Sequence, residues 1–268
     1  MDLGLAGATA VVTGGSKGMG RSTAELLAAE GAKVCVLARG QEAIHETVSS
    51  CQAAGSPDAF GIPTNARKPA DIESAFAHVR ERWGGELNIL INTLGPGAGT
   101  FEELDDAGWD DTLNIGLMAM VRCTRAALPM MKQAAWGRIV NFAAHSIQRQ
   151  NPMLVAYTAS KSALTSVSKN LAKSLAADGI LVNTVSPGTI VTAAFTELLK
   201  PILDEQGLDS SNPHDVMRWI EDVYHQPADI GRAGLPEEVA AVAVFLASPR
   251  NGYVTGANIN VDGGSDFI

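Results

Sequence analysis

The sequence predicts an α/β fold with a doubly wound parallel sheet of about seven strands and helices on both faces. Short apolar runs alternate with longer helical patterns along the 268 residues. Regular alternation of this kind predicts parallel strands joined by right-handed crossovers. The strand runs are continuously apolar, which is typical of a sheet covered on both faces. Because no linker or change of composition divides the chain, we expect a single domain over residues 1–268.

The first half of the chain supplies four strands. ATAVVT (8–13) predicts a buried strand, and RSTAELLAAEG after it predicts a helix that ends at Gly31. KVCVLA (33–38) is the second strand and precedes a helix at 41–54. AFGIPT (59–64) is the third, before a helix at about 69–84, and LNILIN (87–92) is the fourth.

The second half supplies the remaining three strands. GRIVNFA, ILVNTVS and NINVD predict strands at 137–143, 180–186 and 258–262, with helices at about 104–134, 152–177 and 236–248. Residues 193–235 interrupt this rhythm, because they contain three prolines and helical patterns but no strand. Long excursions of this kind usually serve as lids or binding loops. We therefore expect 193–235 to be a substrate-binding lid.

The composition argues against several classes of protein. The formal net charge is −9, from 29 acidic and 20 basic residues. An acidic chain without basic runs repels nucleic-acid phosphates, so we expect neither nucleic-acid nor membrane partners. The start of the chain lacks a targeting pattern, and no apolar run reaches the roughly 20 residues that span a bilayer. Cys35, Cys51 and Cys123 fit no metal motif and suit free thiols. We expect a cytoplasmic protein without a metal.

A glycine-rich turn, TGGSKGMG (13–20), joins the first strand to the first helix. Gly14 and Gly18 allow a tight turn that approaches a diphosphate, and Gly20 allows close packing of the helix. The helix N-terminus offers unpaired N–H groups and a partial positive charge to an anion. Such a turn alone is a weak signal, but its place between a strand and a helix predicts a Rossmann-like dinucleotide site.

The end of the second strand indicates which dinucleotide binds. An acid there would bind the ribose hydroxyls of NAD, whereas an arginine would accept the 2′-phosphate of NADP. This chain has Arg39 at that point and no acid before Glu42, and Lys17 adds a cation on the turn. We therefore expect NADP(H) as the cofactor.

With TGGSKGMG, YTASK and SPGTIVT in this order, the whole chain resembles the short-chain dehydrogenase/reductase family. In particular it resembles the NADP-preferring, 3-oxoacyl-acyl-carrier-protein-reductase-like branch. The resemblance implies a homotetramer and an NADP-dependent oxidoreductase that interconverts a ketone and a secondary alcohol. Its implied cofactor-binding residues are Thr13, Gly14, Ser16, Lys17, Gly18, Met19, Gly20, Arg39, Asn65, Ala66, Asn92, Leu94, Gly95, Tyr157, Lys161, Pro187, Gly188, Ile190 and Thr192.

Tyr157 and Lys161 form the expected proton-transfer pair. Their spacing places them on one helix face, one turn apart. The Lys161 ammonium, together with the positive nicotinamide of the oxidised cofactor, favours phenolate and lowers the pKa of the tyrosine from about 10. Tyr157 could then exchange a proton with the carbonyl oxygen while Lys161 anchors the nicotinamide ribose. The resemblance implies that Asn114 holds a water that continues a relay from Lys161.

One expected part of this site is missing. The family usually places a serine thirteen residues before the tyrosine, but this chain has Ala144 there. Ser146 could take over the contact to the carbonyl oxygen, or it could be an ordinary loop residue. In an extended chain it would lie about 6–7 Å beyond Ala144 on the same side, with His145 pointing away. A bend after the strand could also bring Ser146 inward, and Gln148 is a weaker candidate.

The substrate is expected between the lid and the nicotinamide, against an apolar wall that includes Leu94, Ile147, Met153 and Phe195. Trp219 could also line this pocket. Two other functions stay open. The missing serine is compatible with a catalytically impaired, NADP-binding regulator or sensor. An enoyl reductase is a further alternative, although those relatives generally space the tyrosine and lysine further apart.

Overall fold

A computed structural model describes residues 2–225 and 227–265. Its centre is a parallel seven-stranded sheet in the order β3-β2-β1-β4-β5-β6-β7. The strands are β1 (Thr9–Thr13), β2 (Lys33–Ala38), β3 (Ala59–Pro63), β4 (Ile89–Asn92), β5 (Gly137–Phe142), β6 (Ile180–Pro187) and β7 (Asn258–Val261). The order reverses between β1 and β4, which creates a crevice at the carboxyl ends of these strands. The expected Rossmann-like sheet is confirmed.

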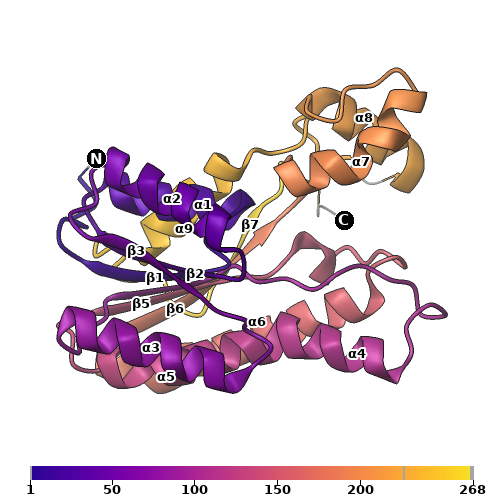
Figure 1. The fold of residues 1–268 in the computed structure, drawn as a ribbon. Coiled ribbons are helices and arrows are strands. Elements are labelled where there is room, and N and C mark those ends of the chain that lie inside the picture. Colours follow the sequence, from indigo (N-terminus) through magenta and orange to yellow (C-terminus); the bar gives the residue numbers. More distant parts are fainter. Residues whose placement is uncertain (1, 226, 266–268) are drawn as a thin grey trace.

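Helices cover both faces of the sheet. α1 (Gly18–Ala29), α2 (Gln41–Ala54) and α9 (Pro236–Ala247) lie on one face, and α3 (Pro69–Trp83), α5 (Ala119–Met131) and α6 (Val155–Leu175) lie on the other (Figure 1). Alternate strand residues accordingly enter two separate cores. Val12, Val36 and Ile91 pack on the α1/α9 side. Val11 and Leu90 pack against α3 and α5 on the opposite side. This two-sided burial explains why the strand segments read as continuous apolar runs.

The prediction of one continuous helix at 104–134 is wrong. Two α-helices, α4 (Asp106–Leu113) and α5, are joined by a π-helical segment, η1 (Asn114–Met118). In this segment the Ala119 N–H donates to the carbonyl of Asn114, five residues back. The helix expected at 152–177 is shorter than predicted, because α6 begins at Val155 and ends at Leu175.

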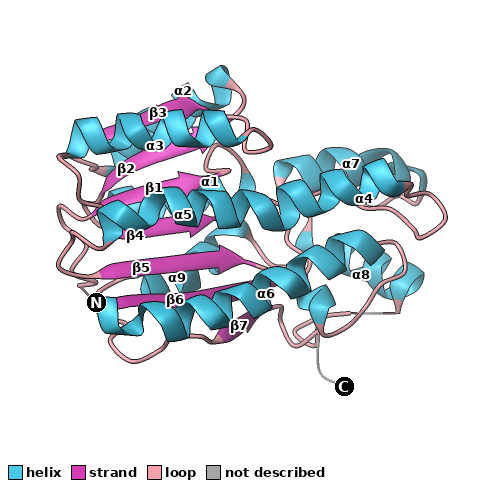
Figure 2. Ribbon diagram, turned by 90° about the horizontal axis from the view of Figure 1, so that it is seen from below, coloured by secondary structure: helices cyan, strands magenta, loops and turns pink. Residues whose placement is uncertain are grey.

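The 193–235 segment contains α7 (Ala193–Glu205) and α8 (Pro213–Tyr224), which lie beyond the carboxyl ends of the strands (Figure 2). We call α7, α8 and the residues between them the lid. Its two helices have their own apolar core around Leu203, Met217 and Trp219. Arg149 donates to the carbonyls of His225 at 3.0 Å and Ser265 at 2.6 Å, so it ties the end of α8 to the body.

Within the described residues no helix has both the length and the apolarity needed to cross a membrane.

Candidate active site

Two cavities lie side by side at the carboxyl edge of the sheet. The turn cavity, of about 820 Å³, surrounds the glycine-rich turn and the ends of β2 and β3. The tyrosine cavity, of about 580 Å³, lies between Tyr157 and the lid. Gly95 lies between them, because it lines the turn cavity and a Cβ on it would be 3.8 Å from the Tyr157 ring.

The predicted cofactor residues divide between these cavities. The turn cavity is lined by Thr13, Gly14, Ser16, Lys17, Arg39, Asn65, Ala66, Leu94 and Gly95. The tyrosine cavity is lined by Met19, Tyr157, Pro187, Gly188, Ile190 and Thr192. The walls of the two cavities do not include Gly18, Gly20, Asn92 or Lys161.

The glycine-rich turn has the shape of a dinucleotide cradle. Gly14 and Gly18 have φ values of +70° and +50°, a region that favours glycine. A Cβ on Gly14 would lie 2.7 Å from the Thr93 hydroxyl, and a Cβ on Gly20 would collide with the carbonyl of Gly14. The same Cβ would lie 2.6 Å from the Thr93 hydroxyl, so Gly20 lets α1 approach the segments that follow β1 and β4.

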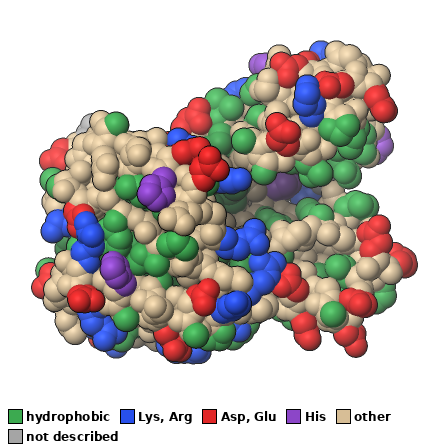
Figure 3. Space-filling model, in the orientation of Figure 1, with side chains coloured by type: hydrophobic (Ala, Val, Ile, Leu, Met, Phe, Trp, Pro, Cys, Tyr) green, Lys and Arg blue, Asp and Glu red, His purple; other side chains and the backbone are tan. Residues whose placement is uncertain are grey.

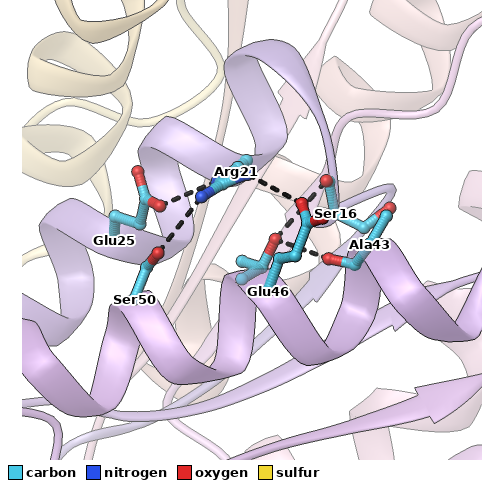
Figure 4. Close-up of polar contacts among 7 residues, drawn as sticks. Ser16, Arg21, Glu25, Ala43, Glu46 and Ser50 are labelled. Atoms are coloured by element: carbon cyan, nitrogen blue, oxygen red, sulfur yellow. Dashed lines mark hydrogen bonds and ion pairs between the residues drawn. The ribbon is translucent and has the colours of Figure 1, made fainter.

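Neighbouring elements hold this cradle in place. The Thr93 hydroxyl donates to the carbonyl of Thr13 at 2.6 Å. Thr47 on α2 donates to the carbonyl of Ser16, and Arg21 binds Glu25, Glu46 and Ser50 at the same junction (Figure 4). Helix α1 has no side-chain N-cap, so its first N–H groups remain available to an anion. These residues fit a dinucleotide diphosphate.

Positive charge gathers on the turn cavity. Lys17 and Arg39 are exposed on its wall, as expected for a 2′-phosphate site. Arg67 also lines it, although Arg67 is bound to Asp111 by two hydrogen bonds of 2.6 and 2.8 Å. No local pattern predicts this ion pair, because its members are 44 positions apart.

Tyr157 and Lys161 lie on one face of α6, as predicted from their spacing. The Lys161 ammonium is 5.9 Å from the centre of the Tyr157 ring. It donates to the carbonyls of Leu94 at 2.8 Å and Phe142 at 2.7 Å, which fix it at the ends of β4 and β5. These bonds place Lys161 beneath the junction of the two cavities.

Burial shifts the pKa of both members of this pair. It raises the pKa of Tyr157 to about 12 and lowers the pKa of Lys161 to about 7. Tyr157 therefore holds its proton at neutral pH. The lowering of the Tyr157 pKa by Lys161 and the oxidised nicotinamide concerns the cofactor complex and stays a prediction.

The segment after β5 bends, so the extended geometry considered for Ser146 is wrong. Residues His145–Ile147 form a 3₁₀ turn, η2. Both His145 and Ser146 consequently line the tyrosine cavity together with Ala144. His145 does not point away, and its Nδ1 lies 3.1 Å from the carbonyl of Pro187. Ser146 is 1% exposed, and its hydroxyl oxygen accepts a 3.0 Å hydrogen bond from Thr158.

Asn114 begins the π-helical segment. Its side-chain oxygen accepts from Arg122, and its amide donates to the carbonyl of Arg67 at 3.5 Å. Lys161 is bound to two backbone carbonyls instead, so the relay between Lys161 and Asn114 stays a prediction.

Asn92 supports the floor of the site. Its side-chain oxygen accepts from Thr13 at 3.3 Å, and its amide donates to Asn141 at 2.8 Å. Asn141 in turn donates to Ser168 on α6 at 2.9 Å. This buried polar chain crosses β1, β4 and β5 below both cavities.

The wall of the tyrosine cavity is mostly apolar. Met153, Phe195 and Trp219 line it, as predicted. Ile147 does not, because it packs against Met120 and Leu164, and Leu94 lines the turn cavity instead. Gln148 lies with Ile147 in a separate surface groove.

The lid adds further apolar side chains to this wall, and Leu198 among them is 67% exposed. Figure 3 shows the hollow between the lid and the body, with hydrophobic side chains along its lid side. Across residues 2–225 and 227–265, no three His, Cys, Asp or Glu side chains gather where they could hold a metal ion.

Comparison with known proteins shows which family this chain is similar to. The family model described as enoyl-(acyl carrier protein) reductase matches residues 14–266. The short-chain reductase protein NovJ of Streptomyces niveus is 32% identical over 95% of this chain and 92% of its own. The 3-oxoacyl-[acyl-carrier-protein] reductase FabG of Vibrio cholerae is 31% identical over 99% of this chain and 100% of its own.

A solved structure gives the same result. The L-sorbose reductase of Gluconobacter frateurii, in complex with NADPH and L-sorbose, superposes with a TM-score of 0.92 at 30% identity. The match covers 100% of both chains. The chain therefore belongs to the short-chain dehydrogenase/reductase family of oxidoreductases, on its 3-oxoacyl-acyl-carrier-protein-reductase-like branch.

Proposed function

We propose that this protein is an NADP(H)-dependent oxidoreductase that interconverts a ketone and a secondary alcohol, with Tyr157 as the acid and base. The observation that carries the proposal is the position of Tyr157. Its side chain faces an apolar cavity, and Gly95 and Lys161 lie where that cavity meets the dinucleotide cradle.

The cofactor is held by groups on the walls of both cavities. The glycine-rich turn and the start of α1 bind the diphosphate, while Arg39 and Lys17 bind the 2′-phosphate. NADPH supplies the hydride when it is bound. The chain itself orients the ketone and moves one proton from the Tyr157 hydroxyl to the carbonyl oxygen. Lys161, with a pKa of about 7, then resupplies a proton to Tyr157 through solvent or a relay.

The cavity wall favours a ketone with a hydrocarbon body. Phe195, Leu198, Leu199 and Ile202 from α7 face Tyr157 across the tyrosine cavity. A polyol such as the L-sorbose of the similar reductase needs many hydrogen-bond partners, and this wall supplies few. A bulky alicyclic, aromatic or acyl ketone matches the wall better. We also propose that residues 1–268 form a single domain and that 193–235 act as its substrate-binding lid.

The proposed function is tested with NADPH and a panel of ketones of increasing hydrocarbon size. We expect turnover that rises with apolar size and falls by about 100-fold or more in Tyr157→Phe. Tyr253→Phe is the matched control, because Tyr253 is fully exposed and lines neither cavity. Tight NADPH binding without turnover of any carbonyl would favour the regulator instead.

The family description also names enoyl reductases, so the panel should include enones and enoyl thioesters. Reduction of C=C with no reduction of C=O would support that alternative.

We also propose a homotetramer. Strand β7 is one of the two edge strands of the sheet, and all four of its residues are only half-buried, so a second copy could cover it. Light scattering during gel filtration would measure the mass of the assembly.

A further inference from the structure

We propose that Ser146 and Thr158 form a hydroxyl pair that replaces the absent serine of this site. In this pair Ser146 donates to the carbonyl oxygen of the substrate, and Thr158 is a positioning residue that orients Ser146. The inference rests on the proposed ketone reduction and adds the residues that hold its reacting oxygen.

The position normally used for this contact cannot make it here. Ala144 lines the tyrosine cavity beside Tyr157 and presents only a methyl group. The η2 turn brings Ser146 to the same cavity, two positions further along the chain. A hydroxyl donor is thus restored to the wall by a bend in the backbone.

The partner of Ser146 determines where its proton goes. Thr158 donates to the Ser146 oxygen at 3.0 Å, and both side chains are buried. A hydroxyl that accepts one hydrogen bond keeps its own proton for another acceptor. The cavity that Ser146 lines is the space where a substrate oxygen can receive that proton. Accepting from Thr158 also polarises the Ser146 O–H, which strengthens the bond it donates.

The position of Thr158 couples this pair to the tyrosine. Thr158 follows Tyr157 directly on α6, and its N–H donates to the carbonyl of Leu154 at 2.7 Å in the first turn of that helix. Thr158 therefore ties Ser146, on the η2 turn, to the helical turn that carries Tyr157. This bond fixes the two oxygen-binding groups relative to each other, as an oxyanion site requires.

The test measures kcat, KM and NADPH affinity for a set of variants with one accepted ketone. Ser146→Ala should lower kcat by about tenfold or more, because one oxyanion donor is lost. Thr158→Val should lower kcat by a smaller factor, and Thr158→Ser, which keeps the hydroxyl, should restore most of it. NADPH affinity should stay within about twofold of wild type in all three.

Two combinations sharpen the result. The double variant Ser146→Ala/Thr158→Val should be no slower than Ser146→Ala alone, because Thr158 acts through Ser146. Ala144→Ser in the Ser146→Ala background should recover activity by returning a hydroxyl to the usual position. Thr124→Val is the matched control, since Thr124 is a buried threonine on α5 whose hydroxyl contacts Met120 within the same helix.

Unchanged kcat in Ser146→Ala, with Tyr157→Phe inactive, would overturn the pair and leave the proposed function standing. Equal losses of kcat in Thr158→Val and Thr158→Ser would overturn the role of the Thr158 hydroxyl. Melting temperatures of every variant separate these outcomes from failure to fold. Should Ser146→Ala not fold, the comparison of Thr158→Val with Thr158→Ser decides the question.

Discussion

Replacement of Arg39 by alanine is expected to weaken NADPH binding far more than NADH binding. Arg39 lies just after β2 on the wall of the turn cavity, where a 2′-phosphate would meet it. Arg67, on the same wall, is already bound to Asp111, and Lys17 remains as a second cation. Arg39 is therefore the arginine most available to the phosphate.

The magnitude follows from the exposure of this side chain. A hydrogen bond to a charged group contributes about 1.5–3 kcal/mol, and about 1.4 kcal/mol changes Kd tenfold. We expect the Kd of NADPH to rise about 10- to 150-fold, toward the lower end because Arg39 is exposed to solvent. The Kd of NADH, which lacks the phosphate, should change by less than about threefold.

Fluorescence or calorimetric titration at low and high salt measures both constants. The preference for NADPH should shrink as salt screens the exposed charge. Arg250→Ala is the control for net charge, because Arg250 is exposed and binds the carbonyl of Asp2 instead. Equal losses of NADPH and NADH affinity in Arg39→Ala would refute the assignment of the 2′-phosphate to this residue.

Three further changes test the cradle, the buried lysine and the lid. Gly20→Ala should lower the free energy of unfolding by about 1–3 kcal/mol and abolish NADPH binding, because its Cβ would collide with the Gly14 carbonyl. Lys161→Met should remove one contribution to the pH dependence of the free energy of urea unfolding. Because the folded pKa of Lys161 is about 7, its unfolded form binds more protons, so the free energy of unfolding of the wild type should rise relative to that of the variant between pH 7 and 10. Arg149→Ala should raise hydrogen exchange at the end of α8 by about tenfold, because the His225 carbonyl loses its donor.

Each of these changes has its own contrary outcome. A similar loss in Gly252→Ala, where a Cβ meets open space, would show that the Gly20 effect is not steric. A pH slope that persists in Lys161→Met would assign the slope to other groups. Arg82 lies on α3 and serves as the control. If Arg82→Ala raised hydrogen exchange in α8 as much as Arg149→Ala does, the effect could not be assigned to the contact of Arg149 with α8.

The sheet was predictable because its signal is local. Each strand is a short apolar run, and all seven occur within one or two residues of the expected positions. The glycine-rich turn was equally local, and its left-handed Gly14 and Gly18 follow the motif. The break at Asn114 was not predictable, since a π-helical segment leaves the apolar pattern of a helix nearly unchanged.

The chemistry of the site was less predictable, because it depends on contacts between distant segments. The pairing of Arg67 with Asp111 joins residues from different crossovers. The turn at His145–Ile147 brings Ser146 to the wall of the tyrosine cavity, and the sequence alone left its position open. Burial raises the pKa of Tyr157, an effect that helix spacing cannot reveal.

The polar chain from Thr13 through Asn92 and Asn141 to Ser168 links parts of the molecule that belong to different halves of the sequence. Consider a chimera that takes β1 and β4 from one relative and β5 and α6 from another. It would keep the hydrogen bond between Asn92 and Asn141 only if both parents have compatible side chains at these positions. Each mismatch would bury an amide without its partner, at a cost of about 1–3 kcal/mol. These four positions are therefore best exchanged together when the enzyme is recombined or redesigned.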